Sequence, residues 1–316
     1  MLKSLFIGCG GAGSNIVESI QQELSGLEYC DFVTVDTSAA NAKKDIEFIH
    51  LKKDSHSDEL LAGSGGIRGK NLSDVKKGVE AFINNKKLYD FKGVIYLVFS
   101  TNGGSGNIIA ALMLRELLHR DISICCLMVH DTTSKQYAEQ SLDTIKSLYG
   151  IATDCNKALV TIYYLNDKLN VTKVNEIIRK EIKTIIEFND IENIVDIDAE
   201  DMRNFYKPTI YSKLNIAPGI YGISALEYGN VEAIIKNYDV LISRTLTSSD
   251  IDPMTDAGIL QYKKGTNHKY DSESMLLLIN NFEKHYTLLQ TACDSYTNQV
   301  KMFKIEVDRN SDGLVL

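Results

Sequence analysis

The chain has 316 residues, of which 44% are hydrophobic and 24% charged, proportions that are ordinary for a globular protein. Its formal net charge of −8 argues against nucleic acid as the main ligand, because phosphate backbones favour basic surfaces. No apolar run reaches the roughly 18–20 residues of a membrane span, and the six cysteines and the amino-terminal sequence show neither a zinc or disulfide pattern nor a signal peptide, so we expect a cytoplasmic protein.

In the first half of the chain, continuous apolar runs alternate with amphipathic stretches. The apolar runs predict buried strands, and the amphipathic stretches predict helices. Such an alternation is typical of a parallel sheet that helices cover on both faces, so the predicted fold class is α/β with a Rossmann-like parallel sheet. The predicted order is strand 4–9, helix 15–24, strand 31–36, helix 72–85, strand 93–100, helix 108–120, strand 122–130, helix 134–150, strand 158–165 and helix 171–188.

The pattern changes after Asp201. Shorter segments of mixed character predict a smaller second domain, which ends in a late helix over residues 271–300. We expect residues 307–316, VDRNSDGLVL, to form an exposed, partly disordered end.

A first glycine-rich loop, GCGGAG at residues 8–13, stands between the first predicted strand and the first predicted helix, and we call it loop one. Its glycines let the backbone approach a phosphate closely, and the helix start supplies N–H groups and partial positive charge. Asp36 closes the next strand, where a ribose-reading acid stands in a dinucleotide-binding domain. Two alternatives therefore stay open: an NAD(P)-dependent oxidoreductase, and a glycine turn that only lets strand and helix pack.

A second glycine-rich loop, NGGSGN at residues 102–107, follows the strand predicted over residues 93–100, and we call it loop two. A dinucleotide has one pyrophosphate and normally needs one such turn. Two glycine loops at the ends of strands in one sheet suit a longer polyphosphate that is held from two sides. A third glycine cluster, at residues 62–69, could contact a terminal phosphate with Arg68 and Lys70, although both could equally be solvated charges. The P-loop motif does not occur in the sequence.

Loop one, loop two and the sequence LNDKL at residues 165–169 together resemble the tubulin/FtsZ superfamily. That superfamily pairs a G-x-G-G-x-G-x-N loop with a G-G-[ST]-G loop, and its long core helix leads to an N-x-D-x-x-D catalytic loop. Here the catalytic motif reads DIDAED, residues 196–201, with Asp196 in place of the Asn. The resemblance extends over residues 1–205. It is greatest to the tubulins of large bacteriophages (PhuZ-like), with plasmid-partitioning tubulins (TubZ-like) next.

The resemblance implies the tubulin fold and its division into parts. These are a GTP-binding domain over residues 1–170, a core helix with the catalytic loop over 171–205, a smaller α+β activation domain over 206–305 and a C-terminal tail over 306–316.

The resemblance also implies GTP or GDP and Mg²⁺ as ligands, with the phosphates held by the two loops. Asp131 would contact the ribose, unless it caps the following helix, and Asn175 and Glu176 would read guanine, unless they form an ordinary polar helix face. Thr172 stands where the superfamily has a stacking aromatic, so the stacking partner is open. The implied nucleotide-binding residues are Gly10, Gly11, Ala12, Asn15, Asp36, Gly65, Gly66, Asn102, Gly103, Gly104, Ser105, Gly106, Asn107, Asp131, Asn166, Asn175 and Glu176.

Catalysis in the superfamily is split between subunits, since the nucleotide sits in one subunit and the acidic loop comes from the next. Asp198 and Asp201 match the two acids of that loop and would orient the attacking water near the γ-phosphate. The alternative is that DIDAED is simply a helix start, where acidic side chains are favoured.

The function implied is that of a GTPase that polymerises head to tail into dynamic filaments, which position or segregate phage or plasmid DNA. Its partner would be a further copy of itself, together with an adaptor that links it to DNA. Neither direct nucleic-acid binding nor a membrane is expected. Besides the oxidoreductase, a filament protein that binds nucleotide without turnover remains an alternative.

Overall fold

The computed structural model describes residues 1–52, 60–61, 63, 72–166, 171–211, 216–227, 231–247, 259, 261–267 and 273–309. Its strands are β1 (Ser4–Cys9), β2 (Cys30–Asp36), β3 (Glu47–His50), β4 (Val94–Ser100), β5 (Ser123–Asp131), β6 (Ala158–Asn166), β7 (Ile194–Val195), β8 (Gly219–Glu227), β9 (Asp239–Leu246), β10 (Gln261–Asn267) and β11 (Ser274–Asn280). Its α-helices are α1 (Gly10–Glu23), α2 (Leu72–Asn85), α3 (Gly106–His119), α4 (Lys135–Asp154), α5 (Val171–Glu187), α6 (Ala199–Tyr206), α7 (Pro208–Tyr211), α8 (Val231–Asn237) and α9 (Phe282–Arg309). Two short 3₁₀ helices, Ala39–Asn41 and Leu88–Asp90, complete the order.

The strands form one 11-stranded sheet in the order β3-β2-β1-β4-β5-β6-β8-β11-β9-β10-β7. The first six of these strands, from β3 to β6, all pair in parallel. Strands β4 and β5 are buried along almost their whole length, as their continuous apolar runs predict for strands covered on both faces. The α/β fold class and the parallel sheet of the first half are therefore confirmed.

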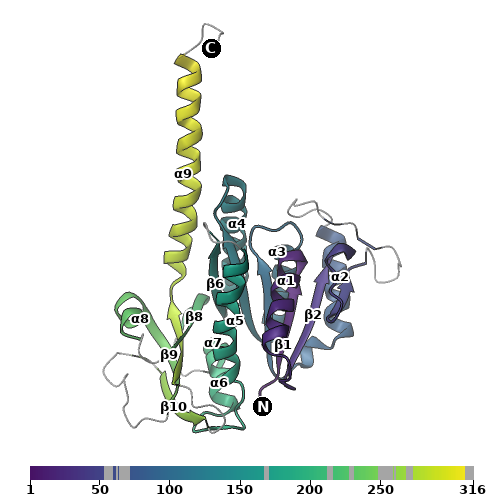
Figure 1. Ribbon diagram of the computed structural model, residues 1–316, viewed down its shortest axis with the longest axis vertical. Coiled ribbons are helices and arrows are strands. Elements are labelled where there is room, and N and C mark those ends of the chain that lie inside the picture. Colours follow the sequence, from purple (N-terminus) through teal and green to yellow (C-terminus); the bar gives the residue numbers. More distant parts are fainter. Residues whose placement is uncertain are drawn as a thin grey trace.

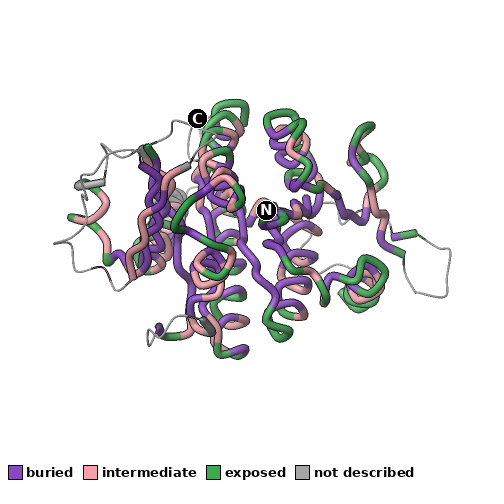
Figure 2. The backbone as a smooth tube through the Cα atoms, turned by 90° about the horizontal axis from the view of Figure 1, so that it is seen from below, coloured by how far each residue is buried: buried purple, intermediate pink, exposed green. Residues whose placement is uncertain are grey.

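Helices cover both faces of this sheet (Figure 1). On one face, α1, α5 and α6 bury apolar residues such as Val17, Ile182 and Phe205 against the sheet. On the other, α2, α3, α4 and α9 bury residues that include Met113 and Ile145. Figure 2 shows the buried strands between these two layers. This arrangement leaves the ends of the parallel strands as the places where loops and helix ends meet.

The second half of the chain extends the same sheet. β8 pairs in parallel with β6, and β11 lies antiparallel between β8 and β9. The predicted helix over 271–300 is wrong in its first part, because residues 274–280 form strand β11. Its continuous apolar run, MLLLI, is buried on both faces of a central strand, and a run of this length fits a strand as well as a helix. The domain boundary near residue 206 stays a prediction.

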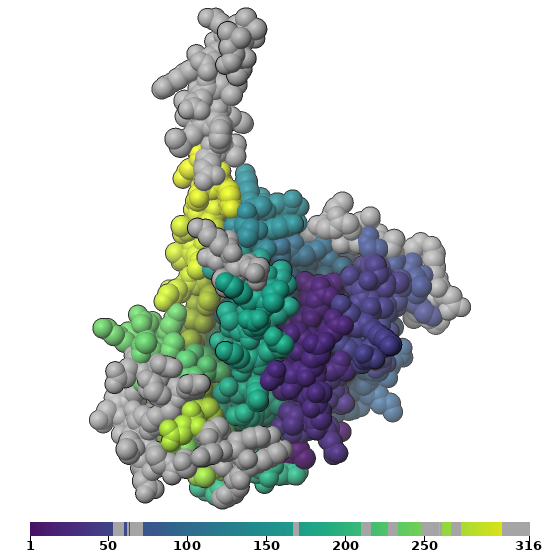
Figure 3. Space-filling view, in the orientation of Figure 1, coloured from purple at the N-terminus to yellow at the C-terminus, as the bar shows by residue number. Residues whose placement is uncertain are grey.

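Helix α9 packs against α4 and then continues past the rest of the molecule (Figure 1). It ends at Arg309, so the first residues of the predicted tail, 306–309, are helical rather than irregular. The remaining tail residues lie outside the described part of the chain. In Figure 3, α5 occupies the middle of the visible face, between α1 and the carboxyl-terminal elements.

Candidate functional site

Loop one has no separate turn, because β1 ends at Cys9 and α1 begins at Gly10. Three glycines of the motif therefore lie in the first turn of α1. This helix begins five residues earlier than the sequence predicted. Gly10 has a φ of +72°, and a Cβ on it would lie 2.7 Å from Cα of Gly106 in loop two. A Cβ on Gly106 would lie 2.4 Å from the carbonyl oxygen of Cys9. The two loops thus touch backbone to backbone, which only glycines permit.

Other glycines of loop one serve packing alone. A Cβ on Gly13 would lie 2.2 Å from the carbonyl oxygen of Val98, and one on Gly8 would lie 2.8 Å from that of Gly13. These two glycines therefore let strand and helix pack closely, which is the alternative that the sequence left open for the motif. This role lets the start of α1 sit directly on the ends of β1 and β4.

The starts of α1 and α3 are both without a side-chain cap. The side chains of Cys9, the N-cap residue of α1, and Ser105, that of α3, accept no hydrogen bond from the N–H groups of their helices, and no acidic residue stands in either first turn. The first N–H groups of a helix have no partner within it and carry partial positive charge. Since Gly10 and Gly106 bring the two helix starts together, their N–H groups lie where they could jointly hold an anion.

Asp36 has a structural role, and its predicted contact with a cofactor stays a prediction. Asp36 is 1% exposed. It accepts hydrogen bonds from the Ser105 hydroxyl at 3.0 Å, from the Thr37 N–H at 2.6 Å and from the Asn41 amide. Asp36 therefore fastens loop two to the end of β2. Asn41, which the sequence did not single out, packs its side-chain amide against Gly11.

Asn107 has a structural role, and its prediction as a nucleotide contact stays a prediction, since its amide oxygen is buried without a partner among the described residues. Asn107 is 1% exposed, and its amide nitrogen donates to the Thr101 carbonyl at 3.0 Å and to the Thr144 hydroxyl at 3.1 Å. Thr144 in turn donates to the same carbonyl at 2.8 Å. These bonds fix the backbone of loop two against α4, which is how Asn107 contributes to the site.

A pocket of about 300 Å³ lies at the carboxyl ends of the parallel strands, beside the two loops. It brings together six of the predicted residues from five different segments: Ala12, Asn15, Asn102, Asp131, Asn166 and Asn175. Its other lining residues are Ile16, Ser100, Val129, Tyr137, Val171 and Val174. We call it the edge pocket. The sequence did not identify its apolar lining, which comes from elements far apart along the chain.

Two polar side chains in the edge pocket orient each other. Asn166 donates from its amide nitrogen to one carboxylate oxygen of Asp131 at 3.0 Å, and the other oxygen accepts from the Thr133 N–H at 2.8 Å. Ser134, not Asp131, caps α4, since it accepts from the Tyr137 N–H at 3.2 Å. The amide oxygen of Asn166 is buried and has no partner among the described residues, so it is available to a donor on a ligand.

Of the other predicted contacts, some line the edge pocket, some do not, and some are not described by the structure. Asn175 lines the edge pocket, but Glu176 is exposed and does not, because adjacent residues of a helix point in different directions. Gly65, Gly66 and residues 167–169 lie outside the described residues.

Lys43, which the sequence missed, donates to the Asn15 side chain at 2.6 Å and pairs with Glu18 at 3.1 Å. These contacts place the Lys43 ammonium beside the second and third turns of α1, where it is paired with Glu18.

The predicted catalytic acids form the start of α6. Asp198 is its N-cap residue and accepts from the N–H groups of Glu200 and Asp201, and Asp201 accepts in return from the Asp198 N–H at 3.0 Å. These N–H groups, that of Asp201 first, lower the pKa of Asp198. The helix-start interpretation is thus correct for the geometry. It does not exclude catalysis, because the exposed Asp198 stays ionised at neutral pH.

Two cations from the second half of the chain hold Asp201. Lys263 of β10 places its ammonium 2.8 Å from the Asp201 carboxylate. The Arg244 side chain of β9 is fully buried and donates to the Asp201 carbonyl at 2.9 and 3.2 Å. Burial lowers the pKa of Arg244 to about 10, which leaves it charged at neutral pH. The acidic loop is therefore fixed by strands β9 and β10.

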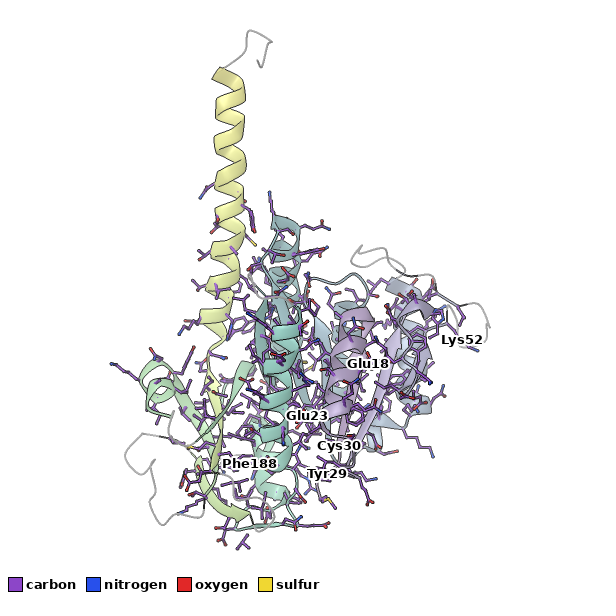
Figure 4. All side chains as sticks on the ribbon, viewed as in Figure 1. Glu18, Glu23, Tyr29, Cys30, Lys52 and Phe188 are labelled. Carbon is purple, nitrogen blue, oxygen red and sulfur yellow. The ribbon has the colours of Figure 1, made fainter. Side chains whose placement is uncertain are left out.

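Helix α6 lies at the edge where the parallel strands begin, opposite the edge pocket. Tyr206 of α6 bonds to Tyr96 of β4 with 2.8 Å between the hydroxyl oxygens, and Asn189, after α5, donates to Tyr96 and to Ser4 at the start of β1. Figure 1 shows α6 at the lower end of the molecule, and Figure 4 places the buried Phe188, which follows α5, at that end. Strand β1 alone separates the two edges by about 20 Å. The acids cannot reach the edge pocket of their own subunit.

The described residues contain no group of three or more His, Cys, Asp or Glu side chains that could hold a metal ion. A Mg²⁺ ion that is bound mainly by phosphate oxygens needs few protein ligands, so these residues are compatible with one carried by a nucleotide. None of the described helices is both long and apolar enough to cross a membrane.

Comparisons with known proteins agree with this geometry. No protein-family model matches the chain. A phage tubulin-like protein of Pseudomonas phage PhiPA3 is 29% identical over 154 residues, which are 48% of this chain and 44% of that protein. The chain thus spans less than half the length of this relative. Two solved structures, a protofilament of TubZ from bacteriophage PhiKZ and the phage tubulin PhuZ with GDP, have TM-scores of 0.78 and 0.76. In both, 96% of this chain and 93% of the other are covered at 18% identity, so the likeness shows the fold.

Proposed function

From the tubulin fold of the chain and its resemblance to the phage-encoded branch of the tubulin/FtsZ superfamily, we propose that it is a GTPase that assembles head to tail into filaments. One observation carries this proposal. The edge pocket and the acids Asp198 and Asp201 lie at opposite edges of one sheet. Only a second subunit, stacked with its acidic loop over the pocket of the first, can bring the two halves together.

The binding half follows from the edge pocket and the two loops. The joined starts of α1 and α3 would hold the phosphates through backbone N–H groups. The base and ribose would occupy the edge pocket, where the free amide oxygen of Asn166 can accept from guanine, and Asn175 also lines this pocket.

The catalytic half comes from the neighbouring subunit. Its Asp201 and Asp198 would orient a water molecule for attack on the γ-phosphorus, and the bond to the β-phosphate oxygen would break to give GDP and phosphate. Mg²⁺ on the triphosphate would supply charge neutralisation. The contribution of the chain is position and electrostatics, and the contacts from Lys263 and Arg244 hold the acids in place for it.

The proposed contact joins unlike surfaces, the pocket end of one subunit and the acidic end of the next. A heterologous contact that does not close into a ring produces an open filament. Such a filament, in the cytoplasm of a host bacterium, would position or segregate phage or plasmid DNA through an adaptor. The solved TubZ protofilament of bacteriophage PhiKZ, with the same fold, supports the filament.

The oxidoreductase alternative has less support. Its ribose-reading acid, Asp36, is buried and engaged by Ser105, Thr37 and Asn41. Thermal unfolding in the presence of ligands separates the two functions. GTP at one hundred times its Kd should add about 2.7 kcal/mol to the free energy of unfolding, and NADPH should add nothing.

The proposal is tested by the GTPase rate per subunit as a function of protein concentration, with light scattering recorded in parallel. We expect a rate near zero below a threshold concentration, which rises together with scattering above it. Asp201→Asn should still scatter with GTP but show almost no turnover. A rate per subunit that is independent of concentration would contradict the shared site. Wild-type filaments without turnover would favour the non-hydrolysing alternative.

A further inference from the structure

We propose that Tyr137, in the first turn of α4, provides the flat surface on which the nucleotide base stacks. This inference rests on the proposed function and assigns one residue within its site. Thr172 of α5 cannot stack a base, and the sequence offers no other candidate by resemblance. The edge pocket offers a candidate, because Tyr137 is the one aromatic side chain among its lining residues.

The exposure of Tyr137 fits a ligand contact better than a packing role. Its side chain is 41% exposed, whereas Tyr96, Tyr164 and Tyr206 are buried in the cores of the molecule. The next residue of α4, Ala138, is fully buried, so the helix packs on the rest of the molecule through the face of Ala138 and not through that of Tyr137. The Tyr137 ring is instead part of a pocket wall that also contains the apolar side chains of Val171 and Val174.

The backbone of Tyr137 is fixed by the same turn that carries the polar groups of the pocket. Ser134 accepts from the Tyr137 N–H, and Asp131 accepts from the Thr133 N–H while it holds Asn166. A ligand that bonds to Asn166 or Asp131 would therefore meet the Tyr137 ring, whose backbone attachment is already held in place. Preorganisation of this kind reduces the entropy lost on binding.

The two helices that border the pocket come from opposite faces of the sheet. Helix α4 packs in the core cluster of one face through Leu142, and α5 packs in that of the other through Ile178. Tyr137 and Val174 thus approach the edge pocket from the two sides of the sheet. A planar base between them would have an aromatic ring on one side and an aliphatic side chain on the other.

The absence of tryptophan from the chain makes this inference directly measurable. Tyr137→Trp would introduce a single indole at the proposed stacking position, and a guanine in van der Waals contact quenches indole fluorescence. The matched control is Tyr149→Trp, because Tyr149 lies on the same helix with the same 41% exposure but does not line the edge pocket. GDP is the ligand, at protein concentrations below any assembly, and tripolyphosphate is the probe without a base.

We expect GDP to quench Tyr137→Trp in a saturable manner and to leave Tyr149→Trp unchanged. Tripolyphosphate should bind without quenching. Tyr137→Ala should weaken GDP binding roughly 5- to 100-fold, the range for loss of one stacked base, while Tyr137→Phe keeps the wild-type Kd. The affinity for tripolyphosphate should be the same in all four variants, which shows that each is folded.

Two results would overturn the inference, and they differ in what they mean for the function. If wild type binds GDP, Tyr137→Ala binds it equally well and Tyr137→Trp is not quenched, the stacking role is wrong while the GTPase proposal stands. If wild type does not bind GDP in equilibrium dialysis, both the stacking role and the proposed function fail.

Discussion

The ammonium of Lys263 lies 2.8 Å from the carboxylate of Asp201, and this ion pair joins strand β10 to the acidic loop at the start of α6. The two residues are 62 positions apart in the chain. The Asp201 side chain is 14% exposed and that of Lys263 43%, so solvent screens the pair only in part. The elements after residue 206 therefore hold the acid on which the proposed catalysis depends.

This pair should be measurable by a double-mutant cycle. Lys263→Met and Asp201→Asn, alone and together, should give a coupling of about 0.5–1 kcal/mol in the free energy of unfolding, as expected for a partly exposed pair. Urea denaturation at low salt and at 1 M salt is the measurement, and high salt should reduce the coupling. Lys263→Arg should behave nearly as wild type. A coupling of zero at low salt would show that the contact contributes nothing to the position of the loop.

The cap formed by Asp198 predicts a pH dependence. Because its folded pKa lies below the unfolded value of about 3.9, Asp198 stabilises the folded state above that pH, and the contribution is lost as the pH falls through the folded pKa. Asp198→Ala should cost about 0.5–2 kcal/mol at pH 7, the usual value of an N-cap. The difference from wild type should disappear at the acid end of a denaturation series. An unchanged difference at pH 2 would mean that the charge of Asp198 has no part in capping.

The contact between the two glycine loops predicts opposite effects for two Gly→Ala changes. Gly106→Ala should lower the free energy of unfolding by about 1–3 kcal/mol, because its Cβ would lie 2.4 Å from the Cys9 carbonyl oxygen. Gly150→Ala, within α4 and with no atom within 4 Å of its Cβ, should raise it by about 0.5–1 kcal/mol. Thermal unfolding of the Gly106→Ala and Gly150→Ala variants tests both expected effects. A stable Gly106→Ala protein would show that loops one and two do not touch as described.

Regular elements were predictable from sequence where periodicity is strong. The helix predicted over 72–85 has those bounds in the structure, and the strands that end in loops one and two lie where the apolar runs place them. Helix α1 starts earlier than expected, because glycines at its first turn indicate a turn when read alone. Strand β11 was mistaken for helix, since a buried apolar run carries no period that separates the two.

The site was predictable as a set of segments but not as a set of contacts. The edge pocket contains Asn15, Asn102, Asp131, Asn166 and Asn175, all of which the motifs indicated. Asp36 and Asn107 were expected to face a ligand, and in the structure they bond to Ser105 and Thr144, from other segments of the fold. Tyr137, Lys43 and Asn41 belong to no motif. Their places depend on tertiary packing, which local spacing cannot reveal.

The most direct test of the shared active site follows a labelled nucleotide between subunits. Asp201→Asn subunits would be loaded with GTP labelled in its γ-phosphate and mixed with excess wild-type subunits in unlabelled GTP, which dilutes any label that dissociates. The control replaces wild type with unlabelled Asp201→Asn. If each pocket is completed by the next subunit, wild-type acids will release labelled phosphate from the variant's pockets at close to the wild-type rate. Release no faster than in the control, while the unlabelled GTP is hydrolysed, would show that each subunit acts on its own nucleotide and would contradict the head-to-tail mechanism.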